Sequence, residues 1–204
     1  MEQARIAVLV SGGGTNLQAI LDAQASGTLK SGRVTLVVSD RPGAYALERA
    51  GKAGVKALEI GKKACGGQEP FERALNAALE ENGTDVIVLA GFLSILTESF
   101  TARWAKRIVN VHPSLIPSFC GAGFYGLKVH EAALARGVKV TGATVHFVNE
   151  IPDGGEIIAQ KAVEVLPGDT PEALQRRVME QAEWIILPQS VEKVCAGLMS
   201  RREG

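Results

Sequence analysis

Short apolar runs alternate with helix-like patterns through the first half of the chain. Each apolar run is followed by a turn rich in glycine or proline and then by residues with helical spacing. The predicted strands are residues 6–10, 34–38, 55–58, 86–90 and 108–111, and the predicted helices are 16–25, the run after Gly43 through Ala53, and 71–81 after Pro70. This alternation predicts a parallel sheet with helices on both faces.

The pattern changes after Val129. A helix-like segment at 129–136 precedes two apolar runs, 140–148 and 157–165, which flank the turn signal of residues 152–155. Two such runs around an Asp-Gly turn predict an antiparallel hairpin at the edge of the sheet. Thr170 is a suitable N-cap and Pro171 a suitable first residue for a long C-terminal helix. We therefore predict an α/β fold with a doubly wound, mostly parallel sheet, and a single domain over residues 1–204.

Composition narrows the function classes. Lys plus Arg and Asp plus Glu both number 22, so the formal charge is zero and a dedicated nucleic-acid binder is disfavoured. The three cysteines lack a C-x-x-C pair, which predicts neither a disulfide framework nor a metal site and fits a reducing, cytoplasmic location. The uncharged stretch 108–127 is interrupted by two prolines and three glycines, so we expect a loop-rich segment and no membrane partner.

The first candidate site is the glycine-rich turn Ser11–Asn16, which connects the first predicted strand to the first predicted helix. Glycines expose backbone N–H groups there, and the helix N-terminus adds the positive end of a dipole. The turn is not a Walker loop because no lysine follows it, and Leu17 occupies the third glycine position of the dinucleotide fingerprint. A monophosphate is therefore the favoured ligand, with a plain strand–helix turn as the alternative.

The second candidate site is Asn110 and His112, at the end of a predicted buried strand. Residues two apart in a strand face the same side, and ligands of open α/β sheets lie beyond the carboxyl ends of the strands. An amide donor beside an imidazole suits oxyanion stabilisation and proton transfer. The alternative is a buried polar pair at the sheet edge.

The third candidate is Asp153. Asp-Gly is a common turn sequence, so a structural role alone would explain it. A carboxylate near His112 would instead favour the imidazolium form that an acid catalyst needs. Spacing along the chain does not decide between these two readings.

Taken together, five segments resemble the phosphoribosylglycinamide formyltransferases. They occur in the family's order between about residues 6 and 188, and they are Ser11–Asn16, Leu89–Phe92, Asn110–Pro117, Thr141–Phe147 and Asp153–Gly155. The resemblance implies a Rossmann-like formyltransferase fold, with a nucleotide-binding half of about residues 1–110 and a folate-binding, catalytic half of about 111–204. It implies transfer of a formyl group from 10-formyltetrahydrofolate to glycinamide ribonucleotide in purine biosynthesis, without a metal.

The resemblance also assigns roles to individual residues. Catalysis would fall to Asn110, His112 and Asp153, and the substrate phosphate to Gly14, Thr15 and Asn16. The folate would contact Asn110 and a segment around Ser94, while two further residues would line the active site. The implied folate contacts are Gln68, Leu93, Ser94, Ile95, Leu96 and Asn110, and the further residues are His146 and Glu183.

Several positions depart from the family pattern. Gln68 and Ser94 stand where basic residues are common, and Cys120 stands where lysine is frequent, with Lys128 as a possible substitute charge. A formyltetrahydrofolate hydrolase, a methionyl-tRNA formyltransferase and a non-catalytic nucleotide- or folate-binding protein remain alternatives. The first two usually carry an additional domain, for which we expect no room here. We expect a monomer or a homodimer.

Overall fold

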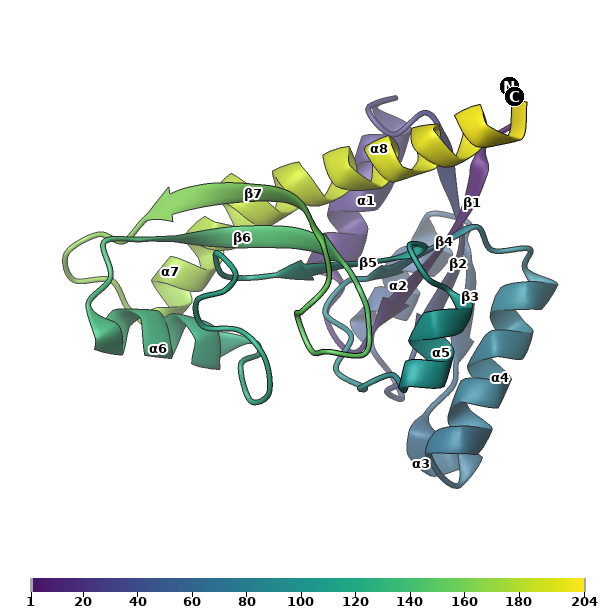
Figure 1. Ribbon diagram of the computed structural model, residues 1–204, viewed down its shortest axis with the longest axis horizontal. Helices are drawn as coiled ribbons and strands as arrows, with labels where there is room; N and C mark the ends of the chain where they lie inside the picture. Colours follow the sequence, from purple (N-terminus) through teal and green to yellow (C-terminus); the bar gives the residue numbers. More distant parts are fainter. Residues whose placement is uncertain (1, 204) are drawn as a thin grey trace.

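A computed structural model describes residues 2–203 and contains one seven-stranded mixed sheet (Figure 1). The strand order is β3-β2-β1-β4-β5-β6-β7, with parallel pairing from β3 to β5 and antiparallel pairing of β6 with β5 and β7. The strands are β1 Ala4–Val10, β2 Gly32–Ser39, β3 Lys56–Glu59, β4 Val86–Leu89, β5 Ile108–His112, β6 Val140–Phe147 and β7 Ile157–Glu164. The predicted doubly wound sheet and its antiparallel edge are confirmed.

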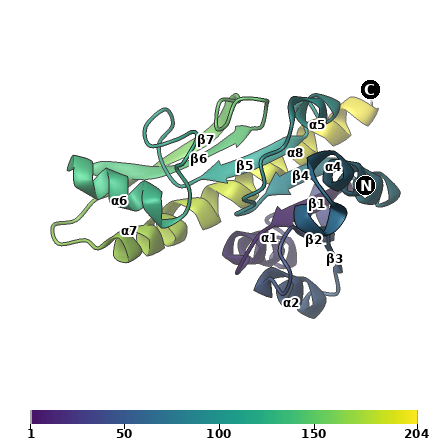
Figure 2. The ribbon, with the colours of Figure 1, turned by 90° about the horizontal axis from the view of Figure 1, so that it is seen from below.

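Helices cover both faces of this sheet. They are α1 Thr15–Ala25, α2 Tyr45–Lys52, α3 Lys62–Cys65, α4 Gln68–Glu81, α5 Glu98–Arg103, α6 Leu127–Arg136, α7 Pro171–Val178 and α8 Trp184–Glu203. Figure 2 shows α1 and α2 on one side of the sheet and α4 and α5 on the other. Each side has its own hydrophobic cluster: α1, α2, α7 and α8 pack on the first, and α4 and α5 on the second.

The central strands are apolar because both of their faces are covered. All four residues of β4 are buried, as are all but one of β1, which is the pattern expected of a strand between two helical layers. The edge strands β3 and β7 are largely exposed and carry charged residues instead. This arrangement leaves the carboxyl ends of β1, β4 and β5 side by side, where parallel α/β sheets bind ligands.

The C-terminal helical region begins as predicted. The Thr170 hydroxyl accepts a hydrogen bond from the Ala173 N–H, and Pro171 occupies the first turn. A π-helical segment, Met179–Glu183, then separates α7 from α8, so the expected long helix consists of three consecutive segments. Such π-helical turns are frequent at functional sites, because the wider turn changes the direction of the side chains that follow.

Two short helices and one loop differ from the sequence-based expectation. The helices α3 and α5 fall in segments without a helical pattern, and α4 begins at Gln68, ahead of Pro70. The hairpin β6–β7 is joined by the whole segment 148–156, which is longer than the tight turn that the Asp-Gly signal suggests. Within residues 2–203, no helix has the length and apolar character that a membrane span requires.

Candidate active site

The site begins with the pairing of β5 and β6. Asn110 of β5 lies directly opposite His146 of β6, and the Asn110 Nδ2 and His146 Nε2 atoms are 3.1 Å apart. His112 lies two residues further along β5 and is 4% exposed, while His146 is 1% exposed. The register of one antiparallel strand pair therefore places an amide and two imidazoles together at the carboxyl end of β5.

The segment between β6 and β7 brings Asp153 to these residues. Its Oδ2 lies 3.5 Å from His112 Nδ1, and its Oδ1 lies 3.6 Å from His146 Nε2. Asp153 has a left-handed backbone, with φ of 56°, and Gly155 packs so tightly that an added Cβ would lie 1.7 Å from the Phe147 carbonyl oxygen. The structure thus brings the three predicted catalytic side chains together, whereas their catalytic roles remain predictions.

Main-chain groups of the loop 116–126 fix the orientation of His112 and Asp153. His112 Nε2 lies 2.9 Å from the Phe119 carbonyl oxygen, and the Gly121 N–H donates to Asp153 Oδ2 at 2.9 Å. Because a carbonyl oxygen only accepts, the Nε2 atom of His112 must carry the hydrogen. Its Nδ1 then faces the carboxylate, so a protonated ring would find an acceptor on both sides.

His146 orients the amide of Asn110 in a similar way. Its Nδ1 donates to the carbonyl oxygen of Phe147 at 2.8 Å, and its Nε2 faces both the Asn110 amide and Asp153 Oδ1. In the neutral ring Nε2 accepts from the Asn110 amide, and in the protonated ring it would donate to Asp153. One N–H of that amide is then engaged, and the second can donate to a ligand. The Asp153 carboxylate therefore contacts both rings, and the Asn110 amide contacts His146.

The Asp153 carboxylate is stabilised in its charged form. Burial opposes ionisation, but the contact with His146, the Gly121 N–H and the charges of His112 and His146 outweigh it and hold the pKa of Asp153 below its usual value. Asp153 is therefore ionised at neutral pH and can balance a positive charge on a neighbouring imidazole.

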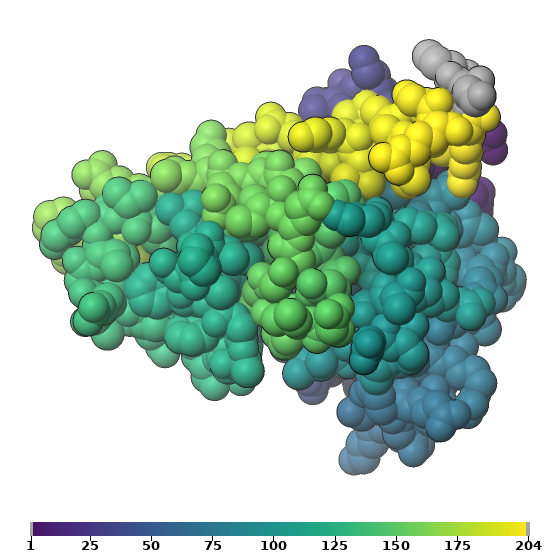
Figure 3. Space-filling model, viewed as in Figure 1, coloured from purple at the N-terminus to yellow at the C-terminus, as the bar shows by residue number. Residues whose placement is uncertain are grey.

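A cavity of about 440 Å³ opens above this cluster. Asn110, His146 and Asp153 line it, together with the segments 92–96, 121–125 and 148–152. Figure 3 shows the green segment after β6 in the middle of this face, between the lobe of α6 and the region of α3 and α4. Leu93, Ile95 and Ile151 are 50%, 76% and 56% exposed in the cavity wall, an apolar surface that suits a flat organic ligand.

The predicted folate residues do not all face this cavity. Leu93, Ser94, Ile95 and Leu96 line it, although the Ser94 hydroxyl donates to the Asp40 carboxylate at 2.5 Å. Gln68 is not part of the lining, and its amide donates to the Ile95 carbonyl oxygen at 3.0 Å. Gln68 therefore supports the wall from behind.

The glycine-rich turn lies next to the same wall. The Ser11 N–H donates to the Gly91 carbonyl oxygen at 3.1 Å, and the Ser11 hydroxyl accepts from the Leu93 N–H at 2.8 Å. Gly14 precedes α1 with φ of 72°, and no side chain caps the helix. The exposed Thr15 hydroxyl contacts Met179 Sδ at 3.9 Å, so the π-helical segment borders the turn.

Glu183, the last residue of the π-helical segment, meets the glycine-rich turn through Asn16. The Asn16 Nδ2 atom donates to Glu183 Oε2 at 2.7 Å, whereas the buried Asn16 Oδ1 has no partner within the described residues. Burial raises the pKa of Glu183 to about 7, and the hydrogen bond from Asn16 opposes that rise. A predicted phosphate contact, Asn16, and a predicted active-site residue, Glu183, therefore form one buried pair at the N-terminal end of α1.

Comparison with known proteins identifies the family of this chain. The sequence model described as "Formyl transferase" matches residues 4–191. The chain belongs to this formyltransferase family.

Solved structures and characterised relatives agree with that assignment. The crystal structure of glycinamide ribonucleotide transformylase 1 from Symbiobacterium toebii has a TM-score of 0.89 and 45% identity, covering 96% of this chain and 89% of that one. The phosphoribosylglycinamide formyltransferase of Haemophilus influenzae is 40% identical over 90% of this chain and 84% of its own length. The human trifunctional purine biosynthetic protein adenosine-3 is 40% identical over 99% of this chain, which spans only 19% of that relative.

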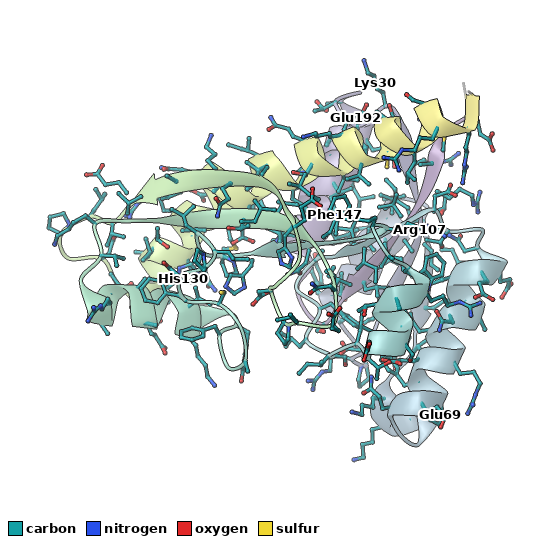
Figure 4. All side chains as sticks on the ribbon, in the orientation of Figure 1. Lys30, Glu69, Arg107, His130, Phe147 and Glu192 are labelled. Carbon is teal, nitrogen blue, oxygen red and sulfur yellow. The ribbon has the colours of Figure 1, made fainter. Side chains whose placement is uncertain are left out.

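Sequence reasoning missed several groups in and around this candidate site. The Phe119 carbonyl and the Gly121 N–H belong to the main chain, so no residue type signals them. His130 of α6 is fully buried, and Figure 4 places it between α6 and the β5–β7 part of the sheet. Burial, with a smaller effect of His112, lowers the pKa of His130 to about 4, so this ring stays neutral.

Within residues 2–203 the structure gives no support for a metal site or for a disulfide. No group of three His, Cys, Asp or Glu side chains there is arranged to hold a metal ion. Cys65 and Cys120 are half-buried and Cys195 is buried, and all three are free. Burial raises the pKa of the Cys120 thiol and the charge of Asp153 adds to the effect, so this loop cysteine is a poor nucleophile.

Proposed function

We propose that the chain transfers the formyl group of 10-formyltetrahydrofolate to the amine of glycinamide ribonucleotide, a step of purine biosynthesis. One observation carries this proposal: Asn110, His146 and Asp153 line an apolar cavity, with His112 in contact with Asp153. Beside it lies a glycine-rich turn whose Gly13 and Gly14 N–H groups have no hydrogen-bond partner among residues 2–203. A folate fits the cavity by its flat ring, and a phosphate fits the turn by its charge.

The reaction follows from the donors at the cavity floor. The neutral amine nitrogen attacks the formyl carbon, and the carbonyl oxygen becomes an oxyanion. The free N–H of Asn110 donates to that oxyanion, and the Nδ1–H of protonated His112, which lies 3.5 Å from Asp153 Oδ2, is shared between that carboxylate and the oxyanion. The bond from carbon to the folate nitrogen then breaks, and the proton lost by the amine passes through water held by Asp153 to the leaving nitrogen.

The binding roles complete the proposal. Gly14, Thr15 and Asn16 hold the phosphate, and Glu183 lies at the side of the acceptor, where it already accepts from Asn16. The folate ring packs on Leu93, Ile95 and Leu96, which are supplied by the first half of the chain. The cavity is therefore shared by both halves of the proposed single domain, rather than belonging to the second half.

Location and assembly belong to the same proposal. The three free thiols support a reducing cytoplasm, and the balanced charge supports small-molecule substrates without nucleic acid. The oligomeric state stays a prediction of a monomer or a homodimer.

The decisive test is folate turnover measured with and without glycinamide ribonucleotide. Turnover that depends on the acceptor, with formylated ribonucleotide as product, is the expected result. Equal turnover without the acceptor would instead assign a hydrolase. Binding of both ligands without turnover would reduce the chain to a binding protein, and either outcome contradicts the proposed transfer.

A further inference from the structure

Helix α2 binds two successive carbonyl groups of the glycine-rich turn. The Gly12 carbonyl oxygen accepts from the Ala46 N–H at 3.1 Å, and the Gly13 carbonyl oxygen accepts from Arg49 Nε at 2.8 Å. Gly14 lies directly on the same helix, because an added Cβ would come within 2.7 Å of Ala46 Cβ. Both peptide groups are therefore anchored on one side by α2.

Anchoring the carbonyls determines where the N–H groups point. In a planar trans peptide the N–H is antiparallel to the C=O, so the N–H groups of Gly13 and Gly14 face away from α2. Neither N–H has a hydrogen-bond partner among residues 2–203. Successive N–H groups that face one way form a concave anion site, and the left-handed Gly14 is the conformation that such a site needs.

Arg49 is itself held in one orientation. Its Nη1 donates to Gln18 Oε1 at 3.0 Å, and Gln18 Nε2 donates in turn to Asp22 Oδ1 at 2.8 Å. The guanidinium carbon also lies 5.0 Å from the ring centre of Tyr45. Because two donors of its fork are engaged by the protein, the side chain fixes the Gly13–Gly14 peptide by geometry and not only by charge.

We infer that Arg49 is a positioning residue for the acceptor phosphate, acting through the Gly13 carbonyl to aim the Gly14 N–H into the phosphate site. The inference rests on the proposed function, since it concerns the same ribonucleotide. The inference predicts different effects on the two substrates. Loss of Arg49 weakens binding of the ribonucleotide, while the apolar cavity wall and the Asn110–His112–Asp153 cluster keep their contacts.

The test uses Arg49→Met, which keeps the aliphatic stem and removes the donors. We expect the KM for glycinamide ribonucleotide to rise about tenfold or more, the effect of losing one well-aligned hydrogen bond to an anion. The kcat at saturation and the KM for the folate should stay within about twofold of the wild type. Arg73→Met is the matched control, because Arg73 is an exposed arginine of α4 that pairs with Glu69 on the helix surface.

Gln18→Met provides a second variant that leaves every charge in place. It removes the acceptor that orients Arg49, so the KM for the ribonucleotide should rise in the same direction by a smaller factor. The double variant should show less than the product of the two separate effects, because both act through one peptide group. This variant also keeps the inference testable if Arg49→Met fails to fold.

Three outcomes would overturn the inference. The first is an unchanged KM for the ribonucleotide in Arg49→Met, and the second is an equal rise in the KM for both substrates. The third is full activity of both Gln18→Met and Arg49→Lys, which would leave only a diffuse effect of charge. A wild-type chain without acceptor-dependent turnover would instead contradict the proposed function, so the two failures are distinguishable.

Discussion

The floor and the wall of the cavity are built on different principles. On the floor, the His112 and His146 rings are almost fully buried, and hydrogen bonds and ionic contacts fix them from two strands and two loops. In the wall, Leu93 and Ile95 expose half or more of their surface, and no hydrogen bond fixes their side chains. The difference predicts that the floor controls the rate of the chemical step, whereas the wall controls the affinity for the folate.

Removing an imidazole from the cavity floor should have the largest effect on the rate. His112→Ala should lower kcat by about 10²–10³, as does the loss of one oxyanion donor in other enzymes, and Asn110→Ala should do the same. Steady-state turnover measures the effect, and an unchanged melting temperature and KM for the folate control for misfolding. Near-normal turnover of His112→Ala would remove this residue from the mechanism.

Asp153→Asn tests the charge on the floor. The amide keeps an oxygen for the Gly121 N–H but removes the negative charge beside His112, so kcat should fall about 10²-fold. The pKa of Asp153 lies below its usual value, so the acidic limb of the pH–rate profile that reports its ionisation should disappear in the variant. If rate and profile both stayed unchanged, Asp153 would be only a turn residue.

A charge placed in the cavity wall should raise the KM for the folate and leave kcat unchanged. Ile95→Asp should raise the KM for the folate about tenfold, because an apolar side chain that the ligand covers contributes roughly that much binding. Leu166→Asp is the matched control, since Leu166 is 43% exposed and does not line the cavity. A fall in kcat without a change in KM would show that the wall takes part in the chemistry.

Glu183→Gln should change how the stability of the folded chain depends on pH. The pKa of Glu183 is raised to about 7 in the folded chain, so the folded state binds a proton more tightly than the unfolded state. The wild type therefore loses stability as pH rises from about 5 through 7, and the uncharged variant does not. Its melting temperature should exceed that of the wild type by on the order of 5 °C at pH 8 and by little at pH 5. Parallel curves would contradict a buried, titrating Glu183.

The sequence reveals the strands of this fold better than the contacts between them. The run Val86–Leu89 is wholly apolar, and its central position in the sheet follows directly from that pattern. By contrast, α5 has six residues, and its start depends on Thr97, whose N–H and hydroxyl both bind the distant Glu72 carboxylate. The Thr97 hydroxyl also accepts from the Phe100 N–H, so the N-cap is a local signal, but six residues are too few to show a helical pattern.

For the candidate site, too, the sequence reveals individual residues better than the contacts between them. Asn110 and His112 were identifiable because they lie two residues apart at the end of an otherwise apolar strand. Their partners depend on the register of β5 with β6 and on the path of segment 148–156, which the turn signal of Asp153 does not specify. The π-helical segment was not predicted either, because it involves a buried contact between Glu183 and Asn16.

The absence of a side chain at Gly155 has a consequence for how this protein tolerates change. Any other residue there would drive a methyl group into the Phe147 carbonyl oxygen, so the strand ends could no longer approach each other. The carboxylate two positions earlier would move with the displaced chain and lose its place between the two imidazoles. A single hydrogen atom in place of a carbon thus sets the alignment of the carboxylate and the imidazoles, at a position that does not line the cavity.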